Sequence, residues 1–258
     1  MEKKYFFFDI DGTLTDRTTG KVVKSALETL KKLEAEGHFV AIATGRAHYK
    51  AQKFIKANGF KNMVCNGGNG IVINNNFVEN IPLNREGCIK IIRQAESLGY
   101  GWCVALDDTK DVYMKDDLFL QQAGKRKEPT RYIIDDSVII EKIPQFLKVY
   151  LSIPAEEEEK LTTKELVGHL RFEPEYLMFQ PDNKRGGILK MMEHLHADPK
   201  HVVVFGDDYN DMDMFCKDWM SIAMGNGCQE LKEMADYVTD TNINDGIKKA
   251  CKHFKWIN

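Results

Sequence analysis

The sequence lacks the features of several protein classes. None of its six cysteines forms a C-x-x-C pair, so it shows no zinc-knuckle or dithiol redox motif. Its 36 basic and 39 acidic side chains nearly balance, and Lys125–Lys127 is the longest basic run, so no positive field would attract nucleic acid. The apolar run Tyr5–Phe8 is interrupted by Asp9, and no stretch reaches the length of a membrane span. A G-x-x-x-x-G-K-[ST] loop for nucleoside triphosphates is also missing.

The composition is that of a globular protein. The chain has 258 residues, 43% of them hydrophobic and 29% charged, which is enough to bury a core in one large domain or two smaller ones. A chain of this size does not need disulfides for stability, so we interpret the cysteines as reduced thiols in a cytosol. We expect a cytoplasmic protein that binds neither nucleic acid nor a membrane.

Both ends of the chain alternate strands with helices. The apolar runs 5–8 and 39–43 are typical of strands buried on both faces. Between them, the helical spacing of 26–33 stops at Gly37, and Ser25 with Glu28 predicts a capping box at the helix start. The β-α-β-α-β order favours a parallel sheet with helices on its faces. We therefore predict an α/β, Rossmann-like parallel-sheet core.

The middle of the chain has a different pattern. Short apolar runs there are separated by turn residues, which indicates hairpins mixed with helices. This predicts an α+β module at 83–180, inserted into a core made of 1–82 and 181–258.

Two carboxylates follow the first apolar strand, in the sequence DIDGT at 9–13. Side chains at i and i+2 of an extended chain point to the same side, and ligands of open α/β sheets bind at the carboxyl ends of strands. We therefore expect Asp9 and Asp11 to project together into a crevice. A divalent cation would relieve their repulsion, and because only oxygen ligands are on offer the expected cation is Mg²⁺. An EF-hand is excluded, since the twelfth residue of such a loop would be Gly20 rather than Glu.

A second acidic group follows another apolar strand, in the sequence GDDYND at 206–211. Asp207 is placed to complete the metal site. Asn210 and Asp211 are expected in the next helical turn, where they could hold Lys184 or a phosphate oxygen. Helix capping is the structural alternative, and it explains one aspartate but not three.

Two further positions give weaker signals for a phosphate site. Thr44-Gly45-Arg46 joins a strand to a helix, and a hydroxyl with N–H groups at a helix start suits a phosphate, although an ordinary helix entry explains the same residues. Lys184 begins a helix, where a cation opposes the helix dipole. Holding a phosphate would compensate for that cost, and a surface lysine is the alternative.

These segments, in this order, resemble the four motifs of the haloacid dehalogenase superfamily. The motifs are D-x-D-G-T at Asp9–Thr13, T-G-R at Thr44–Arg46, Lys184, and G-D-x-x-N-D at Gly206–Asp211. The stretches Ala223–Asn226 and Asn244–Gly246 are similar to the Cof-like branch of sugar-phosphatase-type hydrolases. The chain departs from that branch at Asp208, where Ser is common, and at Gly227, where Ala is usual.

The resemblance implies a role for each residue. Asp9 resembles the nucleophile that forms an aspartyl-phosphate, and Asp11 the acid that protonates the leaving alkoxide and then activates water. The Mg²⁺ ligands would be Asp9, the backbone carbonyl of Asp11, and Asp207. The phosphate would be held by Thr44, Gly45, Lys184 and Asn210. Asp211 and Arg46 would support these residues without contacting the phosphate themselves.

The resemblance also makes the module at 83–180 a cap domain that closes over the crevice and reads the leaving group. It implies a Mg²⁺-dependent phosphatase that hydrolyses a small phosphorylated metabolite, such as a sugar phosphate. A phosphotransferase or phosphomutase of the same superfamily is the alternative. A non-catalytic sensor of phosphorylated ligands would be expected to have lost a motif, whereas all four are present.

Overall fold

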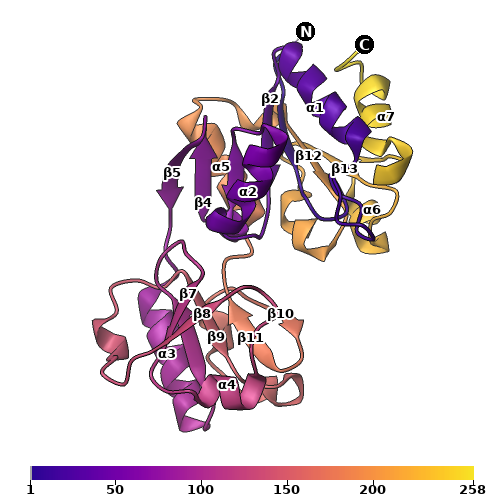
Figure 1. The fold of residues 1–258 in the computed structure, drawn as a ribbon. Coiled ribbons are helices and arrows are strands. Elements are labelled where there is room, and N and C mark those ends of the chain that lie inside the picture. The colour runs from indigo at the N-terminus through magenta and orange to yellow at the C-terminus, as the bar shows by residue number, and fades with distance from the viewer. Residues whose placement is uncertain (1) are drawn as a thin grey trace. The chain divides into compact units, whose positions relative to one another are not determined.

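The structure is a computed structural model that describes residues 2–258. It forms two compact units, one of Met1–Asn80 with Asn183–Asn258 and the other of Ile81–Asp182 (Figure 1). The inserted unit is thus two residues longer at each end than the module expected at 83–180. Among the described helices, none combines the length and apolarity needed to cross a membrane.

An eight-stranded sheet forms the centre of the first unit. Its strands are β1 (Tyr5–Phe8), β2 (Phe39–Ala43), β3 (Met63–Cys65), β4 (Gly70–Ile73), β5 (Asn76–Asn80), β12 (Val202–Gly206), β13 (Met220–Ala223) and β14 (Tyr237–Val238). They lie in the order β14-β13-β12-β1-β2-β3-β4-β5. Neighbours from β14 to β3 are parallel, and β4 and β5 extend the sheet in antiparallel fashion. The parallel α/β core predicted from the sequence is confirmed.

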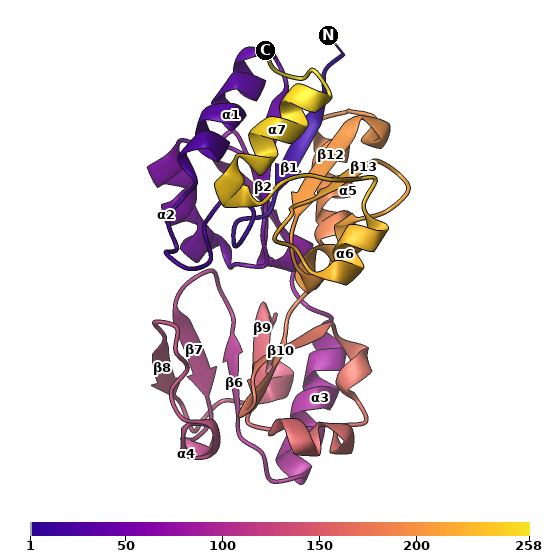
Figure 2. The same cartoon turned by 90° about the vertical axis from the view of Figure 1, so that its right-hand side faces the viewer.

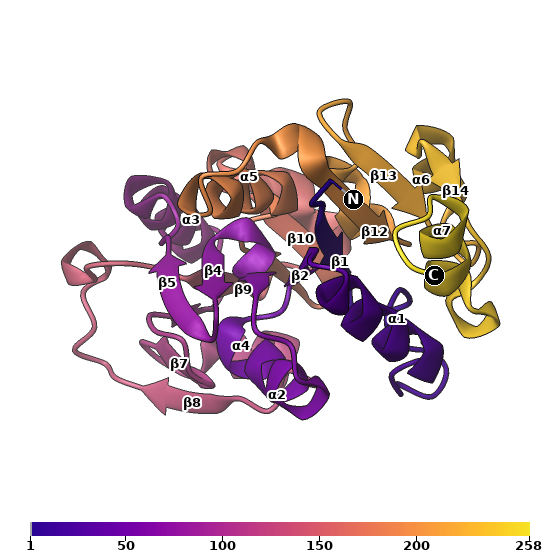
Figure 3. The same ribbon diagram turned by 90° about the horizontal axis from the view of Figure 1, so that it is seen from above.

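Helices cover both faces of this sheet (Figures 2 and 3). One face carries α1 (Lys24–Ala35), α2 (His48–Asn58) and α7 (Gly246–His253), and the other carries α5 (Lys184–His194) and α6 (Gln229–Met234). In β1, Phe6 and Phe8 pack toward the first set of helices and Phe7 toward the second. All three side chains are fully buried, which explains why the strand has no polar face.

The second unit has a six-stranded mixed sheet. Its strands, in the order β10-β11-β9-β6-β7-β8, are β6 (Trp102–Ala105), β7 (Asp111–Met114), β8 (Arg131–Ile134), β9 (Lys148–Leu151), β10 (His169–Glu173) and β11 (Tyr176–Phe179). Side chains alternate between its faces, so that Val104 packs with α3 (Arg85–Ser97) and Cys103 with α4 (Leu118–Ala123).

Several local expectations differ from the structure. The segment expected as a helix after Asp207 is a 3-10 helix. The capping box is wrong, because α1 already begins at Lys24 and its N-cap residue, Val23, makes no side-chain cap hydrogen bond. Ser25 lies inside the helix, where its carbonyl accepts a hydrogen bond from the Thr29 hydroxyl at 2.7 Å.

Short 3-10 helices lie between the longer elements. They are η1 (Asn66–Gly68), η2 (Ile140–Lys142), η3 (Ala155–Lys160), η4 (Lys164–Leu166), η5 (Pro199–His201), η6 (Tyr209–Met214) and η7 (Asn242–Asn244).

Helix α5 lies unusually close to η1, because Gly187 has no side chain at the contact. A Cβ on residue 187 would lie 2.5 Å from Val64 Cγ1 and 2.6 Å from the Gly68 carbonyl oxygen. We predict that Gly187→Ala lowers the free energy of unfolding by about 1–3 kcal/mol, since neither neighbour is a flexible chain end. Chemical denaturation measures this loss. The control is Glu193→Ala on the exposed side of α5, with an expected change within about 0.5 kcal/mol; equal effects would contradict the prediction.

Candidate active site

Two of the predicted aspartates are brought together by neighbouring parallel strands. Strands β1 and β12 pair with Phe8 opposite Phe205, and the Asp9 N–H donates to the Phe205 carbonyl at 3.0 Å. Asp9 therefore follows β1 at the same sheet edge at which Asp207 follows β12. Both residues are buried, with 4% and 2% of their surfaces exposed.

Lys184 joins this pair from the first residue of α5. Its Nζ lies 2.8 Å from Asp9 Oδ1 and 2.6 Å from Asp211 Oδ1, and only 1% of the residue is exposed. A buried ammonium group is stable only when it is paired with opposite charge. The alternative that Lys184 is a surface lysine is therefore wrong.

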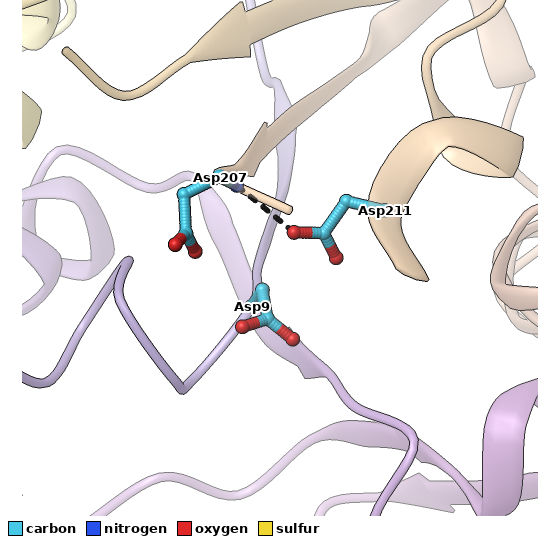
Figure 4. Close-up of side chains that lie close together, drawn as sticks. All are labelled: Asp9, Asp207 and Asp211. Atoms are coloured by element: carbon cyan, nitrogen blue, oxygen red, sulfur yellow. Dashed lines mark hydrogen bonds between the residues drawn. The ribbon is translucent and has the colours of Figure 1, made fainter. Parts of the chain in front are cut away.

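The carboxylates of Asp9, Asp207 and Asp211 converge, with one oxygen of each within 4.8 Å of the others (Figure 4). Burial, with the charge of Asp211 adding to it, raises the pKa of Asp9 to about 7 against the opposing effect of Lys184. Burial also raises the pKa of Asp207 to about 6. These shifts reflect mainly the removal of the two carboxylates from water, and the nearby charge of Asp211 adds to the effect. An all-oxygen donor set of this kind fits Mg²⁺.

Asp211 is bonded to the protein through both of its oxygens. While Oδ1 accepts from Lys184, Oδ2 accepts the backbone N–H groups of Asp207 at 2.9 Å and Asp208 at 3.2 Å. Asp211 is fully buried and closes a capping box with Asp208 at the start of η6. Its side chain thus fixes the turn that carries Asp207 and orients Lys184.

Asp11 lies apart from the buried carboxylates, contrary to the expectation that it would project beside Asp9. Its side chain is 59% exposed, and Arg46 bonds both oxygens, with Nη2 at 2.5 Å and Nε at 3.0 Å. The extended geometry ends at Phe8, and the chain turns at once, with Gly12 at φ +95°. Only the backbone of Asp11 contacts the group, since its N–H donates to Asp9 Oδ2 at 2.8 Å.

The residues predicted to hold phosphate are distributed around the same sheet edge. Thr44 follows β2, the neighbour of β1, and is buried with its hydroxyl accepting the Arg46 N–H at 3.2 Å. Gly45 is half-buried, and α2 begins three residues after it, at His48. Asn210 is half-buried in η6.

Sequence reasoning missed Arg17 and gave Thr13 no role of its own. Thr13 Oγ1 donates to Asp207 Oδ1 at 2.8 Å. Arg17 Nη2 lies 2.8 Å from Asp207 Oδ2 and 2.6 Å from Asp208 Oδ2. Burial acts against ionisation of Asp208, but its pairing with Arg17 lowers the net pKa of that carboxyl. The only signal in the sequence was a basic residue shortly after the D-x-D motif, and spacing alone does not show where it points.

Comparison with known proteins identifies the family. Residues 6–251 match the haloacid dehalogenase-like hydrolases. The chain belongs to this family and is an enzyme of the hydrolase class, as its motifs predicted.

Its relatives include proteins named as phosphatases. A Bacillus subtilis (strain 168) protein with the name "Putative phosphatase YkrA" is 29% identical over 255 residues, 98% of either chain. A phosphoglycolate phosphatase of Archaeoglobus fulgidus is 28% identical over 252 residues, 97% of this chain and 96% of its own. A Bacteroides thetaiotaomicron structure, described among the phosphatases of this superfamily, superposes with a TM-score of 0.80 at 25% identity and covers 99% of this chain and 96% of its own.

The ion pairs of Lys184 give a stability prediction. In Lys184→Met, Asp9 and Asp211 would face each other as buried like charges, so we expect metal-free protein to lose about 3–5 kcal/mol of unfolding free energy at pH 8. Urea denaturation in EDTA measures the loss. Lys190→Met, which removes a partly exposed ion pair with Glu79 from the same helix, should cost at most about 1 kcal/mol. Similar losses in both variants would contradict the assignment.

Proposed function

We propose that this protein is a Mg²⁺-dependent phosphatase that hydrolyses a small phosphorylated metabolite through an aspartyl-phosphate on Asp9. One observation carries the proposal: a buried carboxylate, Asp9, lies 2.8 Å from a buried lysine and beside two further buried carboxylates. An anionic nucleophile can approach an anionic phosphoryl group only where positive charge offsets their repulsion. The relatives named as phosphatases support this reaction over other hydrolyses of the family.

The chemistry takes two steps on the protein's own residues. An Asp9 oxygen forms a bond to phosphorus while the ester P–O bond breaks, and Asp11, released from Arg46 and in its protonated form, gives its proton to the departing alkoxide. Water then attacks the acyl phosphate, Asp11 takes a proton from that water, and phosphate leaves with Asp9 restored. Splitting the reaction in this way replaces one slow displacement with two easier ones.

The remaining residues bind and orient the phosphoryl group. When bound, Mg²⁺ would supply positive charge on the phosphoryl oxygens, and the residues that would hold it are Asp9, Asp207 and the backbone carbonyl of Asp11. Lys184, bonded to Asp9, would offset the negative charge of the transferred group, and Asp211 keeps the ammonium in place. The phosphate contacts would be completed by Thr44, Gly45 and Asn210.

We assign the inserted unit Ile81–Asp182 the role of cap domain, with the leaving group as the part of the substrate that it recognises. Both connections to it start from residues bonded to η1, because Asn80 accepts from Asn66 at 2.9 Å and the Asn183 N–H donates to Gly67 at 2.8 Å. We place the activity in the cytoplasm, where six free thiols remain reduced.

The nucleophile assignment predicts the behaviour of Asp9→Asn. The amide cannot form the aspartyl-phosphate, so kcat with p-nitrophenyl phosphate should fall by at least about 10³-fold. Circular dichroism should show an unchanged fold, because Lys184 keeps its bond to Asp211. As a matched control, Asp136→Asn on the exposed surface of the inserted unit should retain full activity. Turnover of Asp9→Asn at the control's rate would rule out Asp9 as the nucleophile.

The metal assignment predicts loss and recovery of activity. Dialysis against EDTA should abolish phosphate release, and Mg²⁺ should restore it, because three carboxylates share one buried site. Mg²⁺ should also raise the Tm of stripped protein, since it binds only the folded state. Full activity of protein shown by elemental analysis to be metal-free would contradict the assignment.

A further inference from the structure

Arg17 places a positive charge directly on a carboxylate that the proposed function assigns to Mg²⁺. Its Nε lies 3.1 Å and its Nη2 2.8 Å from Asp207 Oδ2, while Nη2 also bonds Asp208 Oδ2 at 2.6 Å. We propose that Arg17 is a displaceable counter-ion that competes with the divalent cation at Asp207 and so sets the Mg²⁺ concentration at which the enzyme becomes loaded. This inference rests on the proposed metal site, and nothing in the D-x-D or G-D-x-x-N-D motifs requires an arginine here.

The loop that carries Arg17 is held by its own hydrogen bonds. Asp16 accepts the Thr18 N–H at 2.9 Å and the Thr19 hydroxyl at 2.8 Å, and its backbone bonds both Gly20 and Lys21. These bonds fix the backbone of the loop, so the Arg17 guanidinium reaches Asp207 from a defined position. Gly12 makes room for this approach, because a Cβ there would collide with both Asp207 Oδ2 and Arg17 Nε.

Burial distinguishes Arg17 from the other cation of the site. The Lys184 side chain is 1% exposed, so it cannot leave its carboxylates without remaining a buried, unpaired charge. The Arg17 side chain is 52% exposed, and its guanidinium can move into water while Asp208, 33% exposed, remains within its reach. The free-energy cost of separating Arg17 from Asp207 is therefore small, and another cation can take its place at that carboxylate.

The charges around the cluster support competition. When ionised, the four carboxylates of Asp9, Asp207, Asp208 and Asp211 face two cations, Lys184 and Arg17, which leaves a net charge of about −2. Asp11 and Arg46 form a separate neutral pair. One divalent cation balances this charge. Without Arg17 the metal-free site would carry one more uncompensated negative charge and attract Mg²⁺ more strongly.

The test is a calorimetric Mg²⁺ titration of EDTA-stripped Arg17→Met against wild type, without substrate. We expect the dissociation constant for Mg²⁺ to fall on the order of tenfold, because a neighbouring like charge and a competing bond are both removed. The Tm of stripped Arg17→Met should be lower than that of stripped wild type, and its rise on adding Mg²⁺ should be larger.

Two further variants make the test specific. Lys21→Met removes an exposed positive charge from the same loop, and its Mg²⁺ affinity should change by less than about twofold, since solvent screens that charge. Arg17→Lys keeps the charge but loses the fork that contacts two carboxylates, so its affinity should lie between those of wild type and Arg17→Met. If Arg17→Met fails to fold, Arg17→Lys decides by the same criterion.

The outcomes separate this inference from the proposed function. If stripped wild type binds no Mg²⁺, the proposed metal site itself is wrong. If wild type binds Mg²⁺ and the Arg17 variants bind it equally or more weakly, Arg17 is not a competitor, and the phosphatase proposal stands without it. Tighter binding in Arg17→Met but not in Lys21→Met supports the inference.

Discussion

The burial of one lysine charge is the constraint on which the site depends. Lys184 stands at the N-terminal end of α5, where the helix dipole disfavours a cation, and it is removed from water. Asp9 and Asp211 compensate for both costs, and they are far apart in the sequence. The ammonium group thus connects the end of β1, α5 and η6 at one sheet edge, and loss of the lysine would leave two buried carboxylates without their shared partner.

The sheet gives these charges a rigid support. Strands β1 and β12 are parallel neighbours, and their side chains below the site are fully buried on both faces. A close-packed interior resists deformation, so the two strands hold Asp9 and Asp207 at a constant separation although the two side chains do not bond each other. The apolar residues that gave the strands their signature in the sequence therefore also fix the geometry of the carboxylates.

The ends of the strands and the acidic residues that follow them could be predicted from the sequence, but the directions of the side chains could not. That Asp9 and Asp207 would share an edge followed from parallel strands with apolar runs, because strand polarity decides where the following residue lies. The direction of Asp11 did not follow, since the rule for extended chains stops applying where the turn after Phe8 begins. Arg17 could not be placed because its loop folds by local Asp16 bonds that periodicity does not reveal. The capping box predicted from Ser25 and Glu28 was wrong because α1 begins at Lys24, one residue before Ser25.

The separation of Asp11 from the buried group fits the demands of its proposed role. The proposed nucleophile needs a fixed position, and Asp9 has one, with one oxygen bonded to Lys184 and the other to the Asp11 N–H. An acid and base must exchange protons with the leaving group and then with water, which requires access rather than burial. Arg46 and Asp11 are both partly exposed, so their ion pair is weak enough to be exchanged for a substrate contact. One D-x-D motif thus provides a buried carboxylate and an exposed one, and the sharp turn between strand β1 and Gly12 separates them.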